Sequence, residues 1–84
     1  MPELTVRYFA GARAAAGVPD ENIELHGAPT VADVLTAVRE RHGEPLTRVL
    51  AAASFLLDGV AVRDRGVAVR SGALLDVLPP FAGG

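Results

Sequence analysis

The stretch Thr30-Val-Ala-Asp-Val-Leu-Thr-Ala-Val-Arg-Glu-Arg-His-Gly43 decides the fold, because it predicts the one long helix of the chain. Thr30 is a good N-cap, and Asp33 stands three residues later in an imperfect capping box. Apolar residues at 31, 34, 35 and 38 follow the spacing of a single buried stripe. Basic residues fill the last turn and Gly43 follows it, which is typical of a helix C-terminus.

Apolar runs on the N-terminal side of this helix predict two strands. Glu3 to Phe9 alternates apolar and polar residues, and Ile23 with Leu25 gives a short second strand. Pro19 to Asn22 reads as a turn before that second strand. The Gly11–Gly17 segment is short enough for a loop or a single helical turn.

A hairpin is predicted on the C-terminal side of the helix. Glu44-Pro45 breaks the chain, and residues 46–53 form either a further turn of helix or an irregular connector. Ser54–Leu57 and Val60–Val62 then flank Asp58-Gly59, a pair suited to a type I′ turn.

Leu74 to Leu78 is predicted as the last strand, after a connector or edge strand at residues 67–70. The order strand–strand–helix–strand–strand–strand predicts an α+β domain over residues 1–78. We expect one main helix on one face of a mixed sheet of four to five strands. If the first and last strands are central neighbours, residues 79–84 leave the domain from a rigid element.

The composition argues against several classes of function. Half of the 84 residues are apolar, and the net charge of −2 is spread along the chain without a basic block. Nucleic acid is therefore not an expected partner, since phosphate neutralisation needs clustered basic residues. No run approaches the roughly 18 apolar residues of a membrane span, and the N-terminus lacks signal-peptide features. We expect a cytoplasmic protein without a membrane partner.

The chain has no cysteine and no lysine, since all eight basic residues are arginines. Thiolate and Schiff-base chemistry are therefore excluded. His26 and His42 do not have metal-ligand spacing, and Asp20, Glu21 and Asp64 are predicted in turns. The glycines and serines match no phosphate-binding or nucleophile motif. We expect no self-sufficient active site, no metal and no bound cofactor.

The sequence ends in Pro79-Pro80-Phe81-Ala82-Gly83-Gly84, a tail that is stiff at its base and thin at its tip. Fully extended, six residues span roughly 20 Å. Glycines lack a Cβ, so a narrow tunnel can admit their backbone closely. The only reactive group of this tail is the α-carboxylate of Gly84.

Four stretches, in order along nearly the whole chain, resemble the MoaD family. They are VRYFAGARAAAGV (6–18), TVADVL (30–35), FLLDGVAV (55–62) and VLPPFAGG (77–84). The P-P-x-A-G-G ending is the most specific part, and it separates this family from the related ThiS carriers, which usually lack the double proline. Phe81 stands where many family members carry valine. The resemblance implies a ubiquitin-like β-grasp fold and the role of small sulfur-carrier subunit of molybdopterin synthase.

The resemblance also implies a reaction sequence and its partners. An E1-like, MoeB-like enzyme would adenylate the terminal carboxylate with ATP, and a sulfurtransferase or sulfide donor would convert the acyl adenylate to a thiocarboxylate. A MoaE-like large subunit would then take the tail and deliver its sulfur to cyclic pyranopterin monophosphate, which gives molybdopterin. The chain by itself would not be an enzyme.

Residue roles follow from the same resemblance. Gly84 would carry the sulfur, Gly83 and Ala82 would permit threading, and Phe81 would anchor the tail in an apolar pocket. Pro79 and Pro80 would limit the entropy lost on docking.

A docking surface is expected on exposed apolar sheet residues near the tail. Phe9, Phe55 and Leu57 are the candidates, although core packing explains each of them at least as well.

Three other functions fit the same residues. The carrier chemistry could serve cysteine or thiamin-thiazole synthesis, although the double proline argues against thiazole. Gly84 could be joined to target lysines like ubiquitin, although a lysine-free chain could not link to copies of itself. The chain could also be a non-catalytic β-grasp interaction module with an inert tail.

Overall fold

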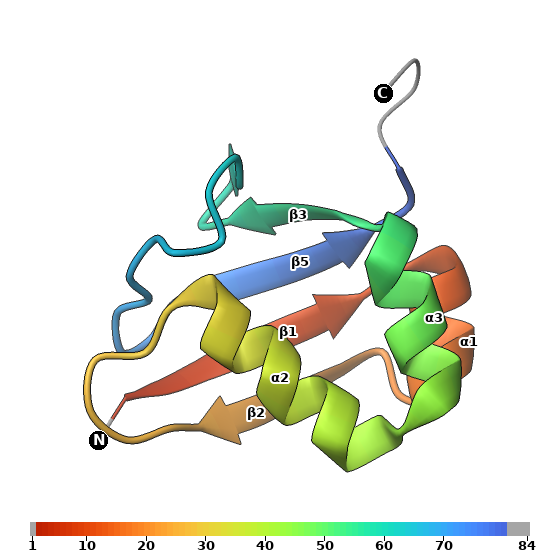
Figure 1. The fold of residues 1–84 in the computed structure, drawn as a ribbon, viewed down its shortest axis with the longest axis horizontal. Coiled ribbons are helices and arrows are strands. Elements are labelled where there is room, and N and C mark those ends of the chain that lie inside the picture. The colour runs from red at the N-terminus through yellow and green to blue at the C-terminus, as the bar shows by residue number, and fades with distance from the viewer. Residues whose placement is uncertain (1, 81–84) are drawn as a thin grey trace.

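The first and last strands lie side by side at the centre of the sheet. In the computed structural model, which describes residues 2–80, β1 (Glu3–Tyr8) pairs in parallel with β5 (Leu74–Leu78). The other three strands are β2 (Asp20–Glu24), β3 (Ser54–Leu57) and β4 (Val60–Ala61). The strand order is β2-β1-β5-β3-β4, and only the β1–β5 pair is parallel (Figure 1). The predicted mixed sheet is confirmed, and the first and last strands are central neighbours, which is the condition stated above for a tail that leaves from a rigid element.

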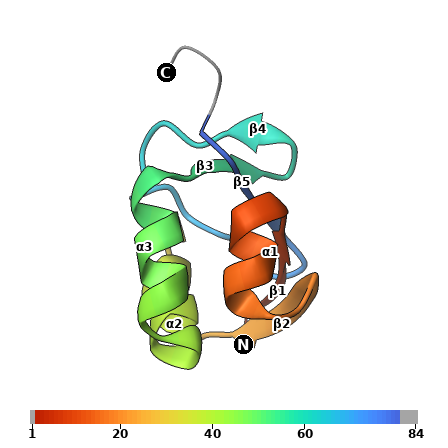
Figure 2. The ribbon, with the colours of Figure 1, turned by 90° about the vertical axis from the view of Figure 1, so that its right-hand side faces the viewer.

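Helices cover one face of this sheet. They are α1 (Ala10–Ala16), α2 (Val31–His42) and α3 (Glu44–Ala52). Figure 2 shows α2 and α3 stacked on one side of the sheet, with α1 beside α3. This is the predicted α+β arrangement, although it has three helices instead of one.

The long helix begins and ends where the sequence predicts. The Thr30 hydroxyl accepts a hydrogen bond from the Asp33 amide at 3.3 Å, and the Asp33 carboxylate accepts one from the Thr30 amide at 2.8 Å. The capping box is therefore complete. At the other end, the amide of Gly43 donates to the Arg39 carbonyl.

Two short helices were not predicted as such. Ala10–Ala16 is rich in alanine, the best helix former, and Gly17 ends it with φ of 79° in the left-handed region. The predicted break lies one residue earlier, at Gly43, and Glu44-Pro45 begins α3, which bears out the helical alternative for residues 46–53. Pro45 lies in the first turn of α3, where its missing amide costs no helical hydrogen bond. The two helices pack against each other, so each is stabilised by a tertiary contact that local patterns do not show.

The second strand also differs from its prediction. Asp20 and Asn22 belong to β2 and not to a turn, and they pair with Arg7 and Thr5 of β1. The hydroxyl of Thr5 donates to the Asn22 side chain at 3.1 Å. Pairing with a central strand overrides the turn preference of these polar residues, because their side chains lie on a solvent-facing surface.

The hairpin is confirmed. Asp58 and Gly59 both have positive φ, at 51° and 84°, as a type I′ turn requires. Asp58 also exchanges hydrogen bonds with the backbone of Leu74 in β5. Within residues 67–70, Ala68 makes a single bridge to Thr30, so this segment is a connector.

One apolar core lies between the sheet and the helices. The central strands contribute Leu4, Val6, Tyr8, Leu75 and Val77, and the predicted stripe of α2 is buried in full. The remaining core residues are Ala12, Ile23, Leu46, Leu50, Phe55, Val69 and Ala73. Among residues 2–80, no helix is long and apolar enough to cross a membrane.

Replacing Thr30 by alanine should lower the free energy of unfolding by about 1 kcal/mol, since it removes the side-chain half of the capping box. Urea unfolding followed by circular dichroism measures this. Thr36→Ala is the matched control, because Thr36 is exposed in the middle of the same helix and alanine favours helix there. Equal losses in the two variants would contradict the capping role.

Candidate functional site

The base of the tail lies at the end of the central strand. The amide of Phe9 donates to the Val77 carbonyl at 3.1 Å, so the hydrogen bonds between β1 and β5 continue to within two residues of Pro79. Pro79 and Pro80 follow β5 directly and are exposed. The described chain therefore leaves the domain from a central strand that is paired on both sides, as expected of a rigid element.

An apolar groove of about 260 Å³ lies beside the two prolines. Pro79, Pro80, Leu78 and Phe9 form one part of its lining, and Phe9 is 38% exposed. The remaining lining residues come from α1 and α3 and are mostly small, namely Ala10, Gly11, Ala12, Val49, Ala52 and Ala53. Small side chains on two packed helices leave a shallow hollow, which can take an apolar side chain next to the tail.

The structure thus brings together three of the predicted site residues, Phe9, Pro79 and Pro80. The other tail residues, Phe81, Ala82, Gly83 and Gly84, lie outside the described residues. Their predicted roles remain predictions.

Phe55 does not have the exposed side chain that a docking residue needs. It is 4% exposed, belongs to the core, and has the Arg65 guanidinium 5.0 Å from its ring centre. The reason is strand parity, meaning that alternate residues of a strand point to opposite faces of the sheet and paired residues point to the same face. Phe55 pairs with Val77, which faces the helices. For Phe55, core packing is the correct interpretation.

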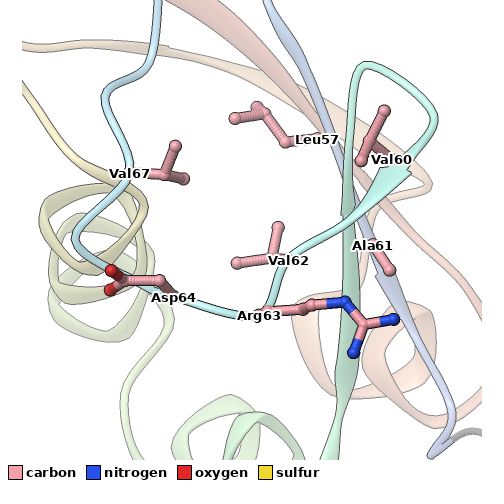
Figure 3. Close-up of a pocket in the computed structure, with 7 residues that line it drawn as sticks. All are labelled: Leu57, Val60, Ala61, Val62, Arg63, Asp64 and Val67. Atoms are coloured by element: carbon pink, nitrogen blue, oxygen red, sulfur yellow. The ribbon is translucent and has the colours of Figure 1, made fainter.

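Leu57 has the same parity and is half-buried against the core. It lines a separate apolar hollow of about 250 Å³, with Val60, Val62 and Val67 (Figure 3). This hollow lies at the hairpin and has no lining residue in common with the groove at the base of the tail.

The sheet surface opposite the helices is called the open face here. Strand register places on it Thr5 and Arg7 of β1, Leu74, Asp76 and Leu78 of β5, Leu56 of β3 and Ala61 of β4. Sequence reasoning did not identify Leu56. Its side of the sheet follows from its pairing with Asp76 of β5, which the three consecutive apolar residues of Ser54–Leu57 do not reveal.

An ion pair lies at the centre of the open face. Arg7 donates from Nε to Asp76 Oδ1 at 2.7 Å and from Nη2 to Oδ2 at 3.0 Å. The Asp76 side chain is 9% exposed and that of Arg7 is 45% exposed. The hydrogen bonds to Asp76 raise the pKa of the Arg7 guanidinium above its ordinary value. The guanidinium carbon also lies 5.6 Å from the ring centre of Phe9.

A second polar cluster lies on the helix-covered side. Glu21 accepts hydrogen bonds from the Tyr8 hydroxyl at 2.5 Å and from Arg41 at 3.0 Å, and His42 Nε2 lies 2.5 Å from the same carboxylate. Burial and the contact with Glu21 raise the pKa of the Tyr8 hydroxyl. Burial alone would raise the pKa of Glu21, but its three hydrogen-bond partners lower it below the ordinary value. These contacts join β1, β2 and the end of α2.

The Glu21 cluster has a structural role in this geometry. Its side chains satisfy one another, and no buried side-chain polar atom among residues 2–80 lacks a partner. The same described residues contain no group of three or more acidic, histidine or cysteine side chains that could hold a metal.

A family model described as the ThiS family matches residues 6–84. No curated protein matches the chain. The match therefore covers almost the whole sequence at the level of the family.

Solved structures agree with this match. The structure assigned to molybdopterin converting factor subunit 1 of Pyrococcus furiosus has a TM-score of 0.86 and 27% identity, over 96% of this chain and 100% of that one. Small archaeal modifier protein 1 of Haloferax volcanii has a TM-score of 0.85 and 25% identity, over 96% and 100%. A chain of the Amycolatopsis orientalis BexX/CysO complex has a TM-score of 0.68 and 25% identity, over 96% of this chain and 99% of that one. The resemblance to the ThiS and MoaD carriers and the β-grasp fold are confirmed.

The lowered pKa of Glu21 predicts how stability depends on pH. A carboxylate with a depressed folded pKa stabilises the fold above its unfolded pKa of 4.5, and this contribution is lost as pH falls through the folded value. We expect the free energy of unfolding to fall below about pH 4.5. Glu21→Gln should flatten that dependence, measured by urea unfolding between pH 3 and pH 7. An unchanged slope would contradict the prediction, and Glu24→Gln, on the exposed part of β2, is the control.

Proposed function

Because the chain belongs to the ThiS family of ubiquitin-like sulfur carriers and modifiers, we propose that it carries sulfur as a thiocarboxylate on Gly84. The observation that carries this proposal is the position of the tail base. The central strand β5 runs directly into Pro79 and Pro80, beside an apolar groove on which a partner can dock. The described domain offers a binding surface, and the tail offers the reactive group.

In the proposed chemistry, the domain only holds the tail so that other enzymes can reach the carboxylate of Gly84. A carboxylate is a poor electrophile, so an E1-like, MoeB-like enzyme would first transfer AMP from ATP to it and release pyrophosphate. A sulfur donor would then displace AMP and leave sulfur in place of one carboxylate oxygen. This requires that Gly84 be the last residue of the mature chain.

For the acceptor, we propose cyclic pyranopterin monophosphate, within a molybdopterin synthase that has a MoaE-like large subunit. The similarity to the Pyrococcus furiosus converting-factor structure and the double proline before the tail support this acceptor. The chain itself would not be the catalyst, because the large subunit would supply the cationic and general-acid groups around the pterin.

A second candidate is favoured by a different comparison. The similarity to small archaeal modifier protein 1 supports attachment of Gly84 to amines of target proteins. The similarity to a complex containing CysO supports the same carrier chemistry with another sulfur acceptor. Conjugates of higher mass in cell extracts would favour attachment, and co-purification of a MoaE-like subunit would favour molybdopterin synthesis.

Deleting Gly84, or adding a C-terminal tag, should abolish ATP consumption by the activating enzyme in the presence of this protein, because the deletion moves the terminal carboxylate back by one residue to Gly83 and the tag converts the Gly84 carboxylate to an amide. An N-terminal tag is the matched control. Since β1 and β5 are parallel, Glu3 lies at the opposite end of the sheet from Leu78, and such a tag should leave activation unchanged. Normal activation of the C-terminally tagged protein would refute the carrier chemistry.

Phe9→Ala should weaken binding of the MoaE-like subunit about tenfold, because the variant removes an exposed aromatic ring from the groove at the base of the tail. The free energy of unfolding should change by less than about 1 kcal/mol, since the ring is partly exposed. Calorimetric titration measures the binding. Val60→Ala is the control, because Val60 is 69% exposed at the hairpin, away from the groove.

A further inference from the structure

The open face carries a charged pair at the border between polar and apolar surface. Polar residues lie on the side of β1 and β2, namely Thr5, Asp20 and Asn22, and leucines lie on the side of β5 and β3. Strand register puts Arg7 and Leu56 on either side of Asp76, in one row across three strands. Leu74 and Leu78 flank Asp76 along β5, and both are half-buried. Asp76 is itself 6% exposed, and it is the one buried charged residue among residues 2–80. A partner that covers this face must therefore cover the Arg7–Asp76 pair.

The pair leaves hydrogen-bond donors unused. A guanidinium has five N–H groups in a fixed fork, and Arg7 directs Nε and Nη2 at Asp76. Within residues 2–80, Nη1 donates to no protein acceptor, and the Arg7 side chain is 45% exposed. Water can satisfy those donors in the free protein. A covering surface that offers no acceptor would leave them unsatisfied, at a cost that lowers affinity about tenfold or more.

The charge around Arg7 determines which acceptor fits. Asp76 bonds to the guanidinium, and exposed Asp20 lies opposite Arg7 in β2 and interacts with it electrostatically. Two carboxylates therefore already face one cation. A third carboxylate from a partner would be repelled, whereas a neutral oxygen, such as a main-chain carbonyl, would accept the hydrogen bond without that penalty.

We propose that the Arg7–Asp76 pair determines partner specificity: it admits an apolar partner surface that places an uncharged hydrogen-bond acceptor opposite Arg7, and it rejects a surface that is wholly apolar or acidic there. This inference rests on the proposed function, because the partner it concerns is the activating enzyme that docks beside the tail. Asp76 lies three residues before Pro79, so a partner that holds the tail has this face within reach.

If the Arg7–Asp76 pair only stabilised the fold, replacing it would change stability and leave partner affinity unchanged. A buried or half-buried ion pair is often replaced by apolar residues with little loss of stability. Such a replacement removes the specificity element, because the partner's acceptor then meets leucine. Stability and partner affinity therefore respond differently to the same substitution.

The test is steady-state activation of the full-length chain by its E1-like enzyme, with ATP and a sulfide donor, as a function of carrier concentration. The first variant is Arg7→Leu with Asp76→Leu, and the second is the exchanged pair, Arg7→Asp with Asp76→Arg. We expect the half-saturating carrier concentration to rise about tenfold in both variants, with kcat within about twofold and the melting temperature close to that of the unaltered chain. The exchanged pair keeps the net charge and the ion pair while it moves the donors to β5.

Glu44→Ala with Arg48→Ala is the matched control, because that exposed ion pair lies on α3, away from the open face. Its half-saturating concentration should not change. An unaltered half-saturating concentration in both Arg7–Asp76 variants, with normal activation of the unaltered chain, would overturn this inference alone. Failure of the unaltered chain to be activated would overturn the proposed function, and this inference with it.

Discussion

The parallel pairing of β1 with β5 is the interaction on which the rest of the structure depends. Parallel strands cannot be joined by a tight turn, so all three helices and the three other strands lie in the connection between them. The two strands contribute five of the buried core side chains, and β3 and β2 are added on their outer sides. The last strand is thereby held on both sides by main-chain hydrogen bonds.

This pairing also determines which residues of the sheet face the core and which lie on the open face. Residues of one parity face α2 and α3 and form the core, and the Glu21 cluster joins the sheet to the end of α2 on that side. Residues of the other parity form the open face, with the Arg7–Asp76 pair at its centre. The same strand that buries Leu75 and Val77 in the core therefore places Asp76 on the open face and leads into Pro79.

The groove beside the prolines follows from α1 and α3, two segments for which the sequence left a helical turn and an irregular structure as alternatives. Alanine in α1 and α3 lets these helices pack closely and leaves a shallow apolar hollow where β5 ends. Had either helix carried large side chains there, the hollow would be filled. Binding surface and helix packing are thus one feature of the fold.

Local rules were sufficient where one segment carries its own signal. The cap at Thr30, the stripe of α2, the Asp58-Gly59 turn and the final strand were all predictable from spacing. The carrier chemistry of the tail was expected from the resemblance to the MoaD family, and it stays a prediction, because Phe81 to Gly84 lie outside the described residues.

Features that depend on distant partners were not predictable. Asp20 and Asn22 form a strand only because β1 lies beside them. Ser54–Leu57 contains three apolar residues in a row, so its parity, and hence the burial of Phe55, is set by its pairing with β5. Arg7 and Asp76 are 69 residues apart, and nothing in either segment predicts their bond.

Intact-mass spectrometry of the untagged chain, after incubation with its E1-like enzyme, ATP and a sulfur donor, tests the sulfur-carrier proposal most directly. The predicted result is a mass gain equal to the exchange of one oxygen for one sulfur, located by fragmentation on Gly84. An unchanged mass, with an activating enzyme that thiocarboxylates another ThiS-family carrier in the same assay, would contradict it.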